Sequence, residues 1–279
     1  MPISANLQDA IQTKFQNSIR SLAKEAKGGK LRGYAEKAIG KGNIDVVFYR
    51  SEEGTVFTGE LNMYAPAWAS TAGKIIKKTA IIDYIYWSHK IKQKELNSTD
   101  LSPQSQLLKS GMNSLRMYED IQIMNKIKAT TGITDLGTSG STIKGQLDDI
   151  VGTTKLAILS AKDALDVTKG VGMVMNRSAY KELFSTELAK NNDYVQLSGA
   201  GGEVAVRFYG CDVITLPDVA LPDKAIYFVP SLSYGFAAWD EGVISSSEFH
   251  NGDDSLWLTA KSSMGAVVLD KEAIIKYKY

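Results

Sequence analysis

The first hydrophobic pattern along the chain has the spacing of an α-helix. Residues 5–27 place apolar side chains on one helical face, and glycines at 28 and 29 end the pattern. Two placements fit such a helix. Its apolar face packs on its own domain while the basic residues are solvated, or it forms an arm that docks on a neighbour or faces a polyanion. The apolar face consists of Leu7, Ile11, Phe15, Ile19, Leu22 and Ala26.

Residues 44–61 give the clearest strand pattern. Two β-prone runs flank a turn at 51–54, where Gly54 can adopt positive φ. A lone hairpin is marginal in water, so either a larger sheet of the same chain or another subunit must cover its faces. Alternation along the strands gives one face with Val46, Phe48 and Phe57, and another with Val47, Tyr49 and Val56.

The rest of the chain mixes helices and strands, which predicts an α+β fold. A strand-rich run at 75–87 precedes a long helix that begins near Ser102 and Pro103 and stops at Gly132. About 25 residues at roughly 1.5 Å each give a helix of about 37 Å, which is long for a compact domain of this size. The later elements are a helix over 143–164, a strand over 171–175, a helix starting at Asn176, short strands over 204–239, and a strand pair over 256–270 that turns at 262–265.

Composition and charge narrow the class of protein. Hydrophobic residues make up 44% and charged residues 23% of the 279 residues, which excludes disordered and coiled-coil chains. Residues 1–42 contain eight Lys/Arg and three Asp/Glu, a local +5 in a chain whose net charge is +1. No run approaches the roughly 20 apolar residues of a membrane helix, and no secretory signal opens the sequence, so we expect no membrane partner.

The sequence offers no catalytic constellation. His89 and His250 have no histidine or cysteine at metal-ligand spacing. Cys211, the single cysteine, lies in an apolar strand, as an inert buried thiol would. Asp148 and Asp149 are adjacent on a helix and point in different directions, which does not suit paired acid–base chemistry. We therefore predict no catalytic, cofactor-binding or metal-binding residue, and no enzyme.

Three later stretches are distinctive in their order: GVGMVMNRSAYKELF at 170–184, VRFYGCDVITLPDVALPDKAIYFVPSLSYGFAAW at 206–239 and LWLTAKSSMGAVVLDKEAIIKY at 256–277. This order resembles the major capsid proteins of tailed bacteriophages, the Hong Kong ninety-seven type fold. The first stretch is similar to the strand and helix after the family's central helices, the second to its apical passage, and the third to its closing hairpin. The likeness departs at 229–231, where VPS replaces the family's Gly-Asp.

The resemblance implies a phage capsid fold of α+β class with four parts. These are an N-terminal arm at 1–42, an extended β-hairpin loop at 43–66, a peripheral domain with a long spine helix at 67–135 and 251–279, and an apical α/β domain at 136–250. The same likeness implies that the protein assembles with itself, as pentamers and hexamers, into an icosahedral shell around phage DNA. It further implies scaffolding and portal proteins as partners, non-specific contact with the packaged DNA, no cofactor, and a virion that is assembled in the cytoplasm of a host bacterium.

The shell hypothesis gives each side chain of the arm and loop an expected role. Subunit contacts are expected at Leu7, Ile11, Phe15, Val47, Phe48, Tyr49, Val56 and Phe57. A DNA-facing basic arm is expected at Arg20, Lys24, Lys27, Lys30 and Arg32. Two alternatives stay open: an encapsulin-like nanocompartment that packages protein cargo, and a soluble enzyme with an unrecognised site.

Overall fold

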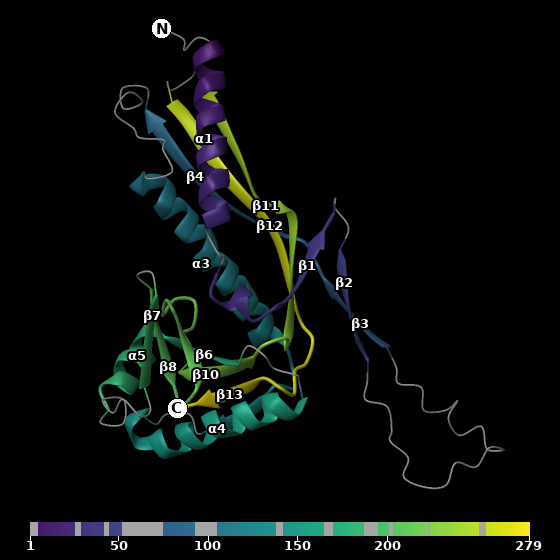
Figure 1. Ribbon diagram of the computed structural model, residues 1–279, viewed down its shortest axis with the longest axis vertical. Coiled ribbons are helices and arrows are strands. Elements are labelled where there is room, and N and C mark those ends of the chain that lie inside the picture. The colour runs from purple at the N-terminus through teal and green to yellow at the C-terminus, as the bar shows by residue number, and fades with distance from the viewer. Residues whose placement is uncertain are drawn as a thin grey trace, which may run out of the picture.

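The computed structural model describes residues 5–25, 29–41, 45–51, 75–92, 105–137, 142–164, 170–186, 195–200, 203–222, 224–250 and 255–279. These ranges form a four-stranded sheet, a seven-stranded sheet and a two-stranded ribbon, with helices on both larger sheets (Figure 1). The four-stranded sheet and two long helices make an elongated body, and the seven-stranded sheet lies at one end of it (Figure 1). The mixture of helices and strands confirms the predicted α+β fold.

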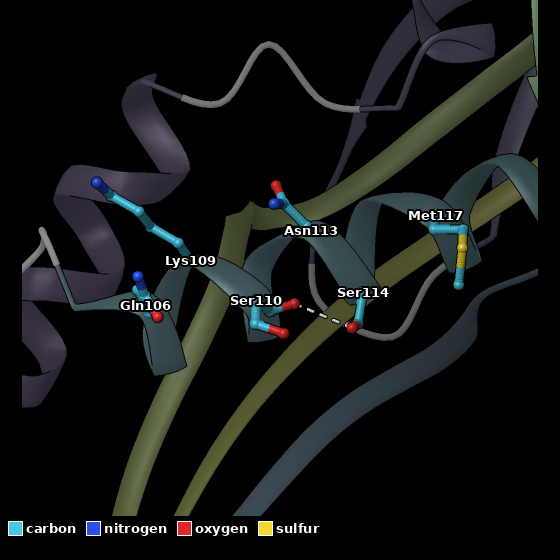
Figure 2. A pocket seen from close by; sticks show the side chains of 6 residues that line it. All are labelled: Gln106, Lys109, Ser110, Asn113, Ser114 and Met117. Carbon is cyan, nitrogen blue, oxygen red and sulfur yellow. Dashed lines mark hydrogen bonds between the residues drawn. The ribbon is translucent and has the colours of Figure 1, made fainter.

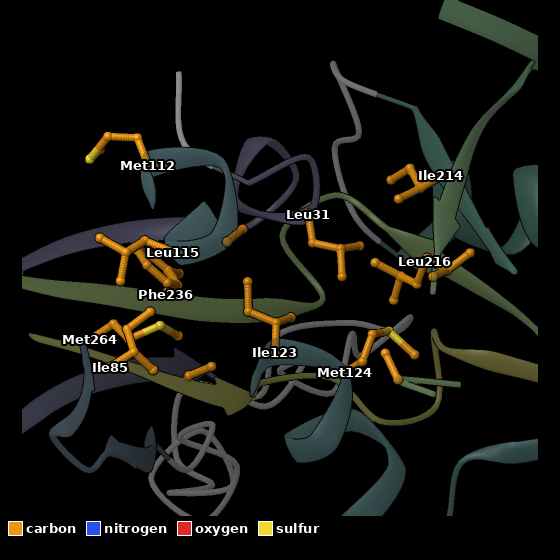
Figure 3. Close-up of a cluster of buried hydrophobic side chains, with 14 of the residues drawn as sticks. Leu31, Ile85, Met112, Leu115, Ile123, Met124, Ile214, Leu216, Phe236 and Met264 are labelled. Atoms are coloured by element: carbon orange, nitrogen blue, oxygen red, sulfur yellow. The ribbon is translucent and has the colours of Figure 1, made fainter. Parts of the chain in front are cut away.

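The four-stranded sheet carries its two long helices on one face. Its order is β1 (Glu36–Gly40), β11 (Tyr234–His250), β12 (Ser255–Val268) and β4 (Asp83–Lys92), with β1 parallel to β11 and the other pairs antiparallel. Helices α1 (Ala5–Glu25) and α3 (Gln106–Ala129) agree with the two helices predicted first. Their apolar side chains share one buried cluster with the sheet. Phe15 and Ile19 of α1 belong to it, and Figure 3 shows Leu115, Ile123 and Phe236 in it.

The seven-stranded sheet has the order β5 (Thr134–Gly137), β13 (Ile275–Lys278), β10 (Ala225–Pro230), β6 (Val171–Asn176), β9 (Cys211–Leu216), β8 (Glu203–Phe208) and β7 (Val195–Ala200). Helices α4 (Leu147–Ala164) and α5 (Arg177–Phe184) cover one face of it, and the short helices η1 (Leu31–Gly33) and η3 (Lys144–Gln146) are single turns. Alternate residues of β6 enter different clusters: Met173 packs under α4, whereas Val174 joins the core of the long body. The two sheets therefore share a continuous apolar interior.

The predicted hairpin is described only in its first strand. β2 (Val46–Ser51) pairs antiparallel with β3 (Ile75–Ala80), a pairing that the sequence did not predict, and the predicted partner at 55–61 lies outside the described residues. Residues 52–74 lie outside the described residues, and Val56 and Phe57 lie with them. The ribbon projects from the long body (Figure 1) and continues to residue 80, beyond the predicted loop boundary at 66. An alternating pattern defines the faces of a strand but not its partner, which explains the difference.

The predicted turn at 262–265 is wrong, because β12 runs through it without interruption. Ser262 Oγ donates a hydrogen bond to Glu119 Oε1 at 3.5 Å. A Cβ at Gly265 would lie 2.5 Å from the carbonyl oxygen of Ile81 and 3.0 Å from the Trp239 ring. Serine and glycine are typical of turns, but here they serve contacts with helix α3 and with a packed indole.

The predicted division into domains stays a prediction, and the sheets do not follow its boundaries. β11 lies within the range 136–250 yet belongs to the same sheet as β12. β13 lies within the range 251–279 yet belongs to the seven-stranded sheet. The chain therefore crosses between the two sheets more often than the predicted boundaries allow.

Candidate functional site

A short segment after α1 is hydrogen-bonded to residues of both larger sheets, and we call this segment, residues 29–34, the strap. The side chain of Asp120 on α3 fixes its first half. Asp120 Oδ2 accepts a hydrogen bond from the Lys30 amide at 3.0 Å, and Oδ1 accepts one from the Leu31 amide at 2.9 Å. On the other side, the Tyr234 hydroxyl donates to the Leu31 carbonyl oxygen. The carboxylate of Asp120 thus binds two backbone amides of the strap, and the phenol of Tyr234 binds one of its carbonyl oxygens.

The neighbouring carboxyl of Glu119 completes this anchor. Its Oε2 accepts a hydrogen bond from the Gly29 amide at 3.4 Å and lies 3.9 Å from Arg32 Nη1. Glu119 and Asp120 are only 5% and 6% exposed. Burial raises the pKa of both carboxyls, that of Asp120 to about 6, because a buried charge loses its hydration. The anchor therefore holds two acids in an environment that disfavours their charged forms.

The second half of the strap is tied to the seven-stranded sheet. The Tyr34 hydroxyl donates to Asp212 on β9, and Asp212 Oδ1 also accepts from Arg207 Nε at 2.5 Å. The Leu232 amide donates to the Tyr34 carbonyl oxygen at 2.7 Å. Burial, and next the hydrogen bond to Asp212, raise the pKa of Tyr34 above its ordinary value, so it remains a neutral donor. The strap thus links α1, the long body and the seven-stranded sheet.

The structure adds contacts within the chain for two arm residues. Arg32 Nη1 lies 3.9 Å from Glu119 Oε2, and the Arg32 guanidinium lies 4.9 Å above the Phe236 ring, so it contributes to the strap, and its DNA-facing role stays a prediction. Phe15 is fully buried in the chain's own core, because α1 packs on β11, and this corrects its assignment to a subunit contact. Ile11 packs against the same cluster. Of the other arm residues, Lys30 is exposed, and the side chains of Leu7, Arg20, Lys24 and Lys27 lie outside the described residues.

The ribbon presents apolar side chains to solvent on one face. Val47 is 37% and Tyr49 is 61% exposed, and they share one face, as the alternating pattern predicted. Phe48 points the other way, where it contacts Gly235 and joins a small cluster with Trp239, so its assignment to a subunit contact is also corrected. The sequence reasoning missed the exposed Ile76 on the partner strand, which pairs with Arg50 and so lies on the opposite face of the ribbon, because the pairing with β3 was not predicted. We call Val47 and Tyr49 the ribbon surface.

Helix α3 carries a shallow, open depression of about 380 Å³ along its first half (Figure 2). A hydrogen bond from Ser114 Oγ to the Ser110 carbonyl oxygen, 2.9 Å long, lies within it. The depression is open, and its lining is polar apart from Met117. All its lining side chains come from α3: Gln106, Lys109, Ser110, Asn113, Ser114 and Met117.

Further sites of chemistry are not found in the described part of the chain. No group of His, Cys, Asp and Glu side chains within it could hold a metal ion. Cys211 is buried, and burial raises the pKa of its thiol to about 12, which keeps it protonated and unreactive. None of the helices described is long and apolar enough to cross a membrane.

Two sheets with a shared core, a long helix, a projecting ribbon and a strapped N-terminal helix define a capsid-type α+β fold. The chain has the fold of phage capsid proteins, which confirms the resemblance seen in the sequence. It is similar to a virus-like particle protein from Pyrococcus furiosus, with a TM-score of 0.60 and 14% identity over 96% of this chain and 99% of that one.

Two phage capsids show the same likeness. The capsid protein of the cyanophage P-SCSP1u matches with a TM-score of 0.61 and 12% identity, over 90% of this chain and 88% of that one. The mature capsid of bacteriophage PhiM1 matches with a TM-score of 0.58 and 11% identity, over 91% and 87%. No protein-family model matches the chain, and no curated protein matches its sequence. The likeness is therefore one of fold.

Proposed function

We propose that this protein is a major capsid protein that assembles as pentamers and hexamers into an icosahedral shell enclosing phage DNA. The observation that carries the proposal is the match to the cyanophage capsid over 90% of this chain and 88% of that one, at a TM-score of 0.61. A match of this extent takes in most of both chains, so it is not a likeness of one common motif. Scaffolding and portal proteins are further partners under this proposal, with assembly in the host cytoplasm.

The ribbon surface supports contact between subunits. Two strands alone make a marginal structure, and the exposed aromatic Tyr49 beside the aliphatic Val47 is typical of a protein contact. Tyr49 and Val47 point away from the chain's own core, so a neighbouring subunit is the partner that can cover them. Val56 and Phe57, outside the described residues, remain part of the same proposed contact.

The proposal assigns no catalytic role. The similar structures are shells, and the described residues offer no pair of titratable groups arranged for catalysis. The encapsulin-like alternative shares the fold but is not favoured over a phage capsid, because the local excess of basic residues in the first 42 suits a nucleic-acid content better than a protein cargo.

Negative-stain electron microscopy of the purified protein tests the proposal. The native protein should form closed shells, tubes or ring-shaped capsomers, with scaffolding protein or a crowding agent added where needed. Tyr49→Asp should leave a folded subunit with native circular dichroism but abolish these particles, because a carboxylate cannot be buried at an apolar contact without a partner. Phe57→Asp should act in the same way.

Tyr49→Phe is the matched control, since it keeps the ring and should assemble normally. If Tyr49→Asp forms native-like particles, the ribbon surface is not part of a subunit contact. A native protein that stays monomeric with scaffold and crowding agent would contradict the shell itself.

A further inference from the structure

The solvent-facing part of helix α3 carries positive charge only. Its two acidic residues, Glu119 and Asp120, are both buried in the strap anchor. Its cations include Lys109 and Lys126, which are exposed. The fold thus removes the acids of this helix from the surface and leaves its cations there, although the whole chain has a net charge of only +1.

The depression on α3 concentrates hydrogen-bond donors along one line of this helix. Lys109, Ser110 and Asn113 lie side by side in it, as Figure 2 shows. From Gln106 to Met117 the line is about 16 Å long at 1.5 Å per residue, about a third longer than the roughly 12 Å width of a DNA major groove. Lysine, serine, asparagine and glutamine are the residue types that commonly contact DNA phosphates. Donor chemistry and charge both indicate an anionic ligand with several contact points.

We propose that the α3 depression binds the phosphate backbone of double-stranded DNA, without reading its bases. The inference rests on the proposed shell function. It assigns the DNA contact to α3 in addition to the predicted basic arm, whose Arg32 contacts Glu119 and Phe236 within the strap. The opposite face of the four-stranded sheet is a poorer candidate. There Lys261 Nζ lies 3.9 Å from the centre of the Tyr84 ring and Lys90 Nζ lies 5.6 Å from that of Trp257, so rings already contact these cations.

Binding of a fluorescein-labelled duplex of about 30 base pairs to the full-length protein tests the proposal, with fluorescence anisotropy recorded from about 50 to 200 mM salt. Lys109→Glu should weaken binding at least tenfold at the lowest salt and reduce the slope of log K against log salt by about 1. Asn113→Asp, which is nearly isosteric, should also weaken binding, by about threefold to tenfold.

Matched controls lie on the same helix. Lys126→Glu and Asn125→Asp make the same charge changes at exposed positions outside the depression, and each should change affinity less than threefold. A loss with Lys126→Glu as large as that with Lys109→Glu would overturn the site, as would native affinity in Lys109→Glu. Competition by poly-L-glutamate as effective as that by unlabelled duplex, per charge, would assign the depression to an acidic polypeptide and equally overturn the proposal.

Shell formation is scored separately by electron microscopy of the same variants. Normal shells from Lys109→Glu with lost duplex binding would support both proposals. Duplex binding that depends on Lys109 in a protein that never forms shells would contradict the shell function and leave the DNA contact standing.

Discussion

Several glycines of the long body lie where an aromatic ring occupies the space of a side chain. A Cβ at Gly235 would lie 2.8 Å from the Phe48 ring, and one at Gly40 would lie 2.2 Å from Trp239 Nε1. Gly111 on α3 has the same relation to Trp87, at 2.7 Å. Contacts this short are closer than van der Waals packing of a methyl group allows, so the absence of a side chain lets the strands, ribbon and helix approach one another.

Gly235→Ala should loosen the ribbon. The new methyl group must displace the Phe48 ring, and such overpacking costs about 1–3 kcal/mol. We expect the free energy of unfolding in urea to fall by this amount. Gly33→Ala is the control, because a Cβ there meets nothing within 4 Å. Equal stability of the Gly235 variant and the native protein would mean that the ribbon does not pack on β11 as described.

Asp120 should give the strap a measurable pH dependence. Burial raises its folded pKa to about 6, above the unfolded value of about 3.9. A group with a raised folded pKa contributes its full stabilisation below the unfolded pKa and loses it as pH rises through the folded value. The contribution of Asp120 is therefore complete below about pH 4 and is lost as the pH rises through about 6.

Asp120→Asn should remove this dependence, because the amide does not ionise. Between about pH 4 and pH 7 the difference in unfolding free energy should move in favour of the variant by up to about 3 kcal/mol, the equivalent of two pKa units. Urea unfolding at several pH values measures it. If the difference in unfolding free energy between the variant and the native protein stays constant with pH, burial does not raise the pKa of Asp120.

At the scale of elements, the strap joins parts that lie far apart in the sequence. Tyr34→Phe deletes the donor to Asp212 and leaves Arg207 in place, so the cost is that of one hydrogen bond to a charged group, about 1.5–3 kcal/mol. Amide hydrogen exchange by mass spectrometry should show at least tenfold faster exchange in residues 29–35. Tyr86→Phe, at an exposed position on β4, should leave it unchanged. Native exchange rates in Tyr34→Phe would argue against the strap as a link.

Most elements could be predicted from local pattern, because the signals are local. The asparagine at 176 caps α5, with its Oδ1 accepting from the Ala179 amide at 2.7 Å, as its position before the helix suggested. Strand partners are decided by contacts distant in sequence. Nothing within residues 44–61 indicates that β2 pairs with residues 75–80. In the same way, the sequence around Ser262 does not indicate that its hydroxyl donates a hydrogen bond to Glu119.

The candidate surfaces were predictable only in part, for the same reason. Periodicity separated Val47 and Tyr49 from Phe48 on β2 but did not indicate which of the two faces is exposed. It could not decide whether the apolar face of α1 meets its own chain or another, and Phe15 is buried in its own chain. Nor did it show that the acids of α3 would be taken inward by the strap, since that depends on where Gly29 and Leu31 lie in space.

At the scale of the whole molecule, the two sheets belong to one cooperative structure. Ile214 and Leu216 of the seven-stranded sheet share a buried cluster with Leu115 and Phe236 of the long body (Figure 3). The strap adds polar links across the same junction. Loosening either sheet therefore exposes apolar surface of the other, and relative movement of the two sheets must keep this interior closed.

The parallel strand pairs also have a consequence during synthesis. Thr134 of β5 pairs with Ile275 of β13, about 140 positions later, and Glu36 of β1 pairs with Gly235. A ribosome that adds about 5–20 residues per second takes roughly 7–30 s to cover the first of these gaps. Through that interval β5 lacks its neighbour, and Phe48 lacks the glycine against which it packs until residue 235 has been added. The nascent chain thus acquires its finished surfaces only late in translation.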